Sequence, residues 1–252
     1  ATEAAAASAI MKISGFLIEG VLNICSLKLN LENFNALIAP NGYGKSNVLD
    51  AISFGIQFLS ASEQGKAQMM RSRYVPINAN MYRQNFRFEI CGAINENGLY
   101  QYGYTFKWAE EGGEGQITSE YLKIKRSTDQ RFKQVVNRTS AEDCLVMPSA
   151  TGRCTKVFEV SSSQLALSTI ALRSDMYLNS FASRICGMSI PNLETLDNPE
   201  SYFSMDGEHG IQMLDGETIS AYLFKLKTTD RNNYAILVDG VLQLLPEIED
   251  FS

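Results

Sequence analysis

Alternating apolar residues dominate the N-terminal part of the chain. They include Leu27, Leu29 and Leu31, and a compact apolar run follows from Phe34 to Ile38. Alternation with a period of two is typical of strands that bury one face. The pattern predicts two strands within residues 11–39 that lead into a third, more buried strand.

A helical period begins soon after this run. Val48, Ile52, Ile56 and Leu59 recur at spacings of three and four residues. This spacing predicts an amphipathic helix from about Ser46 to Leu59. The expected order is therefore strand, glycine-rich loop, helix.

Strand patterns return in the middle of the chain. Phe86, Phe88 and Ile90 alternate with more polar residues, and the segment Tyr100–Trp108 places five aromatic residues on one face. With further strands expected around 121–125 and 131–136, these segments predict an antiparallel sheet. We expect the aromatic face to be buried against a helix, the alternative being a surface that stacks nucleic-acid bases.

Helical spacing takes over beyond Lys156. Residues 161–191 predict a helical hairpin or arm, and apolar stripes predict two further helices, over 219–226 and 234–245, the second ended by Pro246. Residues 1–10 match no signal peptide and are interpreted as a tail or a cloning remnant.

Composition narrows the class of protein. The chain has 252 residues, of which 45% are hydrophobic, and no apolar run approaches the roughly 18 residues that cross a bilayer. Five cysteines without a C-x-x-C pair indicate buried thiols in a reducing, cytoplasmic setting. The single histidine, His209, disfavours zinc enzymes and His-dependent triads.

Charge is distributed unevenly along the chain. Residues 121–156 hold eight basic side chains against three acidic ones, whereas residues 187–252 hold twelve acidic against three basic. The basic segment can be interpreted as a DNA contact or as ordinary solvated surface, and we favour the second because aromatic residues are not regularly interleaved with it.

The loop before the predicted helix carries the one specific motif. It fits the phosphate-binding pattern G-x-x-x-x-G-K-[ST], except that Ala39 replaces the first glycine. Gly42 and Gly44 let backbone N–H groups converge on an anion, Lys45 supplies an ammonium for the β- and γ-phosphates, and Ser46 can bind Mg²⁺. The sequence predicts that ATP and Mg²⁺ bind here, through Ala39, Pro40, Asn41, Gly42, Tyr43, Gly44, Lys45, Ser46 and Asn47.

The string NALIAPNGYGKSNVLDAI resembles the A-P-N-G-x-G-K-S-N loop of ABC-type ATPases of the SMC, RecF and OLD kind. The segments NFRFEICGAINENGLYQYGYTFKW and GQITSEYLKIKR are similar to the sheet of that family, and DGETISAYLFKLK with LLPEIEDF is similar to a later family segment. The likeness extends from Met11 to Phe251, although only the phosphate loop is a specific motif.

The resemblance implies an α/β fold of the P-loop NTPase kind, with a central sheet around the loop helix, an antiparallel β-subdomain and a helical arm. It implies a P-loop and sheet lobe over 11–160, followed over 161–252 by helices that lead towards a further ATPase half. It also implies a head-to-head homodimer of the complete protein, a DNA or effector partner, and a glutamine that positions Mg²⁺, for which Gln164 is preferred over Gln84.

The chain departs from the family pattern at several points. Gly20–Asn23 replaces the N-F-R-S-F segment, no L-S-x-G signature is present, and Asp239 lacks the glutamate that follows in a Walker B strand. Because the residues around Asp239 keep a helical period, we expect a helix there and no ATP turnover by this chain alone. Two alternatives stay open, a non-hydrolysing nucleotide sensor that binds an effector protein and a P-loop kinase or GTPase.

Overall fold

The computed structural model describes residues 11–188 and 226–244, except for 34, 41, 77–80, 82, 96–97, 111–112, 127–128, 130, 141–142 and 150–151 and the side chains of 95 and 241–244. The chain divides into two compact units, Ala1–Ser189 and Ile190–Ser252. The described part of the second unit is residues 226–244, which include helix α6 (Arg231–Leu244), and the other elements described below belong to the first unit. The tail at 1–10 and most of the helix expected at 219–226 lie outside the described residues.

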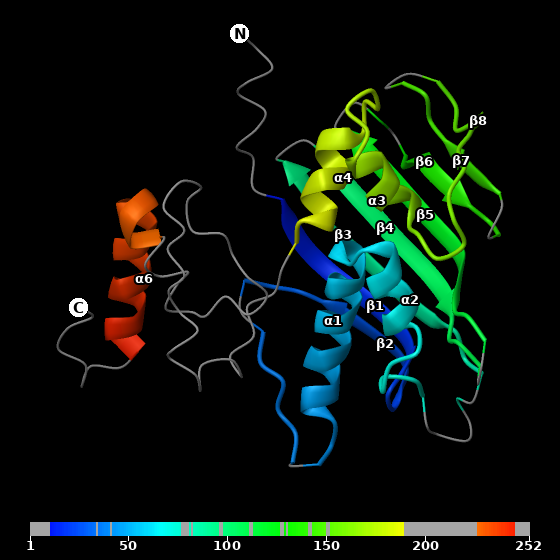
Figure 1. The fold of residues 1–252 in the computed structure, drawn as a ribbon. Helices are drawn as coiled ribbons and strands as arrows, with labels where there is room; N and C mark the ends of the chain where they lie inside the picture. The colour runs from blue at the N-terminus through cyan, green and yellow to red at the C-terminus, as the bar shows by residue number, and fades with distance from the viewer. Residues whose placement is uncertain are drawn as a thin grey trace, which may run out of the picture. The chain divides into compact units, whose positions relative to one another are not determined.

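The first unit is built on one eight-stranded sheet (Figure 1). Its spatial order is β2-β1-β3-β4-β5-β6-β7-β8, and every neighbouring pair is antiparallel. The strands are β1 (Lys12–Val21), β2 (Ile24–Asn30), β3 (Phe86–Asn95), β4 (Gly98–Lys107), β5 (Gln116–Arg126), β6 (Lys133–Arg138), β7 (Cys144–Val146) and β8 (Lys156–Val157).

The prediction of a P-loop NTPase fold is wrong. That fold needs a parallel core sheet, whereas all pairs in this sheet are antiparallel. The segment expected to form the buried strand before the loop is not a strand in its described residues 35–38, and Ile38 is 92% exposed. The apolar run has strand-like composition, but no described strand pairs with it, and an unpaired segment is not a sheet strand.

The helices of the first unit lie over one face of the sheet (Figure 1). The aromatic stripe is responsible for this arrangement, because cross-strand pairs such as Phe88 with Tyr104 and Phe86 with Phe106 place their rings on the same face. The Phe58 ring stacks on Tyr104 and Phe106 at 5.1 and 4.8 Å between centroids. The expected burial of the stripe against a helix is confirmed. The helices are α1 (Lys45–Ser60), α2 (Glu63–Met69), α3 (Ala166–Ala171) and α4 (Asn179–Cys186).

The predicted arm packs on this sheet. Leu167 and Ile170 of α3 and Ile185 of α4 are fully buried in the same core as α1. The helices predicted around 46–59 and 234–245 are confirmed as α1 and α6. No helix within the described ranges combines the length and the apolar character needed to cross a membrane.

Candidate functional site

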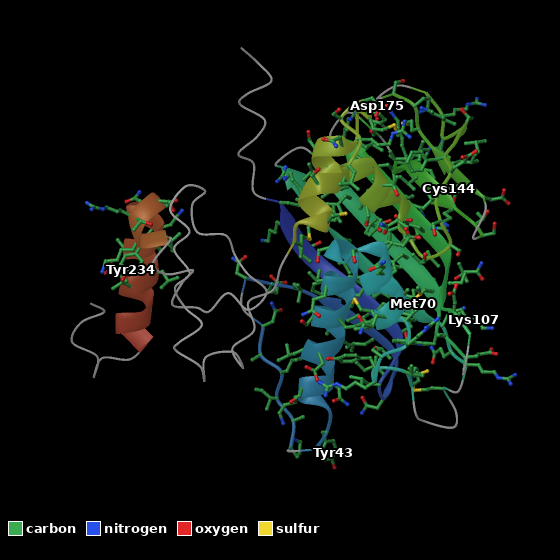
Figure 2. All side chains as sticks on the ribbon, viewed as in Figure 1. Tyr43, Met70, Lys107, Cys144, Asp175 and Tyr234 are labelled. Carbon is green, nitrogen blue, oxygen red and sulfur yellow. The ribbon has the colours of Figure 1, made fainter. Side chains whose placement is uncertain are left out.

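The glycine-rich loop precedes α1 directly. Figure 2 labels Tyr43 at the tip of this loop, where its side chain is 76% exposed. Asn41 lies outside the described residues, and the remaining loop residues from Ala39 to Asn47 are described. The loop is therefore accessible to a ligand at the N-terminal end of a 16-residue helix.

Two glycines set the backbone path of the loop. Gly42 and Gly44 have φ values of 83° and 84°, a region that residues with side chains rarely adopt. A Cβ at Gly42 would meet no atom within 4 Å, so the backbone conformation, and not crowding, requires glycine there. The N–H of Val48 donates to the Gly44 carbonyl at 3.2 Å, which is where α1 begins.

The first turn of α1 carries an uncompensated positive end. Gly44 is the N-cap and offers no side-chain hydrogen bond, and the first turn contains no acidic residue. The first backbone N–H groups of a helix have no intrahelical acceptor, and the helix dipole adds positive potential at the same place. Such an end favours a bound anion.

Lys45 is folded back onto the loop. Its Nζ donates to the carbonyl oxygens of Ala39, at 2.6 Å, and Pro40, at 2.9 Å. The ammonium group is thereby held beside the loop backbone, within reach of any phosphate that the loop receives. The Ser46 side chain next to it is exposed.

The chain matches no protein-family model and no curated protein sequence. The geometry of the loop and the chemistry of its side chains are therefore the features that bear on function.

The magnesium site predicted from Ser46 and Gln164 does not assemble. Gln164 lies just before α3, where its Oε1 accepts the N–H of Leu165 at 3.0 Å. Ser168, in the same helix, donates to the carbonyl of Leu59 at the C-terminal end of α1. Since Ser46 and Leu59 are separated by about 20 Å along the helix at a rise of 1.5 Å per residue, the two predicted ligands lie at opposite ends of α1.

Gln84, the second choice for this role, lies on the same side as the loop. Its Nε2 donates to the carbonyl of Cys25 at 2.8 Å, beside the turn between β1 and β2. That turn contacts the loop through Asn23, whose Oδ1 accepts a 2.9 Å hydrogen bond from Asn47. Of the two glutamines, Gln84 has the better position for a ligand at the loop.

Acidic groups that would complete a catalytic site are not gathered in the described part of the chain. No cluster of three histidine, cysteine, aspartate or glutamate side chains with metal-binding geometry occurs among the described residues. Asp239, which lacks the glutamate that follows in a Walker B strand, lies in helix α6 and is exposed. The expected helix at this position is confirmed.

A buried polar cluster, which sequence reasoning missed, joins the sheet to the helices. Lys66 and Glu120 are fully buried and Arg138 is 1% exposed. The Glu120 carboxylate accepts the N–H groups of Ala166, at 2.6 Å, and Leu167, at 2.9 Å. Its Oε1 also accepts the hydroxyl of Tyr102 at 2.9 Å. Glu120 therefore caps α3, whose own N-cap residue provides no side-chain hydrogen bond.

Burial and the neighbouring charges shift the pKa values within the cluster in opposite directions. Burial raises the pKa of Glu120, while its backbone and Tyr102 donors and the nearby Arg138 act in the opposite direction. Burial lowers the pKa of Lys66 to about 8, partly offset by Cys186, Glu120 and Glu63. The Lys66 ammonium donates to the carbonyl of Ala61 and lies 5.8 Å from the centre of the Phe58 ring. No ligand-accessible group is involved, so the cluster is structural.

The basic segment 121–156 is not a continuous surface. Arg138 is buried and donates to the carbonyls of Gln164 and Ser161, and Lys133 pairs with Asp129 at 2.7 Å. Lys123 is partly exposed, with its Nζ 5.0 Å from the centre of the Tyr121 ring. Only part of the segment can therefore contact a polyanion.

Proposed function

We propose that the loop at residues 39–47 binds the phosphate groups of a nucleotide, ATP together with Mg²⁺. The observation that carries this proposal is the pair of glycines with positive φ, placed directly before an uncapped helix start that bears Lys45 and Ser46. Convergent backbone donors, a helix dipole and a mobile ammonium are the groups that bind a polyphosphate.

The residues fit such a ligand. Space around Gly42 is open, so backbone donors there can be approached closely. The two carbonyl partners of Lys45 are exchangeable, because the side chain can rotate towards a phosphate that offers a full negative charge. Mg²⁺ would neutralise part of the phosphate charge, with Ser46 as its protein ligand and the phosphates and water as the others.

Binding without turnover is the form of this function that we favour. Phosphoryl transfer needs a positioned water and a group that orients it, in addition to phosphate contacts. The loop offers groups that could contact phosphate, and the described residues contain no cluster of three acidic, histidine or cysteine side chains that could hold a catalytic metal. A nucleotide-dependent contact with an effector protein, or with a second copy of the complete protein, would then be the output, in a cytoplasmic setting.

Isothermal titration calorimetry with ATP and Mg²⁺ tests the proposal. Lys45→Ala should weaken binding by at least about tenfold, since it removes a charge-assisted contact. Lys28→Ala is the matched control, because Lys28 is an exposed lysine in strand β2, outside the loop, and its loss should leave affinity unchanged. Equal affinities of the wild-type and Lys45→Ala proteins would refute the assignment, and phosphate release measured in parallel reports any turnover.

A further inference from the structure

The turn between β1 and β2 contacts the phosphate loop. Asn23, in this turn, lies far from the loop in sequence but accepts the Asn47 side-chain N–H at 2.9 Å. Its Nδ2 also lies 3.2 Å from the position that a Cβ on Gly44 would occupy. One amide group therefore binds a residue in the first turn of α1 and lies close to the N-cap residue.

The turn itself is held by long-range hydrogen bonds. The N–H of Leu22 donates to the carbonyl of Tyr74, the Nε1 of Trp108 to the carbonyl of Gly20, and the Nε2 of Gln84 to the carbonyl of Cys25, at distances of 2.9, 2.9 and 2.8 Å. Gly20 has no room for a side chain, since a Cβ there would lie 2.1 Å from the carbonyl oxygen of Asn85. Three separate segments thus fix the backbone that presents Asn23.

The loop needs such an external support. Leu49, one turn into α1, is 60% exposed, and Tyr43 and Ile38 are more exposed still. By contrast, Ile56, Phe58 and Leu59 at the other end of the helix are buried. Apolar packing therefore fixes the C-terminal half of α1 but contributes little at its start, where polar contacts must define the loop.

We propose that Asn23 is a positioning residue, which fixes the exit of the phosphate loop by binding Asn47 and by lying against Gly44. This inference rests on the proposed nucleotide binding for its functional effect. Preorganised donors bind an anion more tightly than donors that must first be ordered, so loss of the Asn23 side chain, which lies outside the loop, should reduce affinity for ATP without any loss of a direct ligand contact.

A double-mutant cycle tests the functional part. Asn23→Ala should weaken ATP binding by about fivefold, the value of one neutral hydrogen bond. Asn47→Ala should weaken it by at least as much, because Asn47 belongs to the loop, and the double variant should be no weaker than Asn47→Ala. Asn30→Ala is the control, an exposed asparagine at the other end of β2. The melting temperature should change little in all four variants. Single variants that bind ATP like the wild type, or effects that add, would overturn the proposal.

Hydrogen exchange tests the same contact without a nucleotide. In Asn23→Ala the amides of residues 43–49 should exchange several-fold faster than in the wild type, while those of 54–60 and all amides of Asn30→Ala stay unchanged. Unchanged exchange at 43–49 would overturn the positioning role even if ATP does not bind. If exchange rises but Lys45→Ala and the wild type bind ATP equally, the positioning role holds and the nucleotide assignment fails.

Discussion

Replacement of Glu120 by glutamine is the most informative test of how the helices are held on the sheet. The carboxylate is fully buried and faces three donors, two backbone N–H groups and the Tyr102 hydroxyl. Glutamine keeps the shape and one acceptor oxygen, but its amide nitrogen is a donor that faces other donors. Hydrogen bonds to a charged group contribute about 1.5 to 3 kcal/mol each, so losing one or two of them should cost about 3 kcal/mol.

Urea unfolding at pH 7 measures this loss. The single tryptophan, Trp108, is buried and reports the native sheet through its fluorescence. Glu120→Gln should lower the free energy of unfolding by about 3 kcal/mol and the melting temperature by about 6 to 12 °C. Glu110→Gln is the control, since its carboxylate pairs with Lys107 at the exposed surface and its loss should leave stability nearly unchanged. If the two variants have equal stability, Glu120 does not cap α3 as a carboxylate.

Two further predictions concern charge. The pKa of Lys66 is lowered from 10.5 to about 8 by burial, so the ammonium destabilises the fold below pH 8, and this penalty is relieved as the pH rises from about 8 to 10.5. We therefore expect the free energy of unfolding of the wild type, relative to that of Lys66→Met, to rise by up to about 3 kcal/mol between pH 8 and 10.5. A difference that stays constant over this range would contradict the lowered pKa of Lys66. If the basic segment binds duplex DNA, electrophoretic mobility shifts should weaken steeply with salt, and Lys123→Ala should lower the slope of log K against log salt by about 1, whereas Lys227→Ala should not. Absence of DNA binding at low salt would mean that Lys123 belongs to ordinary solvated surface.

The sheet could be predicted well because its signal is local. Residues such as Phe88 and Tyr104 alternate with polar neighbours, and alternation directly reports which face of a strand is buried. The apolar stripe also predicts that a helix covers this face. Local periodicity was thus sufficient for the strands between Phe86 and Arg138.

The same reasoning failed where the outcome depends on a partner. An apolar run at 34–38 has the composition of a buried strand, but pairing requires a neighbour that composition does not specify, and Ile38 is exposed. Likewise, the family resemblance suggests Gln164 as a magnesium ligand, whereas the packing of α3 puts this residue at the other end of α1 from Ser46. Periodicity contains no information on such tertiary distances.

One missed feature did leave a local signal. Glu120 occupies the same face of β5 as Leu122, and a carboxylate among buried apolar positions indicates a buried polar partner. The identity of that partner, the start of α3, could not be read from sequence because it lies 46 residues away. Asn23 left no signal at all, since turns commonly contain asparagine for local reasons.

Substitutions near the two ends of α1 should have separate effects. Around Lys45 few apolar contacts oppose movement, so the lysine can exchange its carbonyl partners for a phosphate without disturbing Phe54 or Phe58 in the buried half. Glu120 acts at the opposite end, about 20 Å away along the helix. Since perturbations more than about 10 Å apart with no shared partner are additive, Lys45→Ala should change nucleotide affinity and leave stability, whereas Glu120→Gln should do the reverse. Coupling between the two variants would mean that α1 moves as a rigid body, and the hydrogen bond between Asn23 and Asn47 would then affect the stability of the sheet as well.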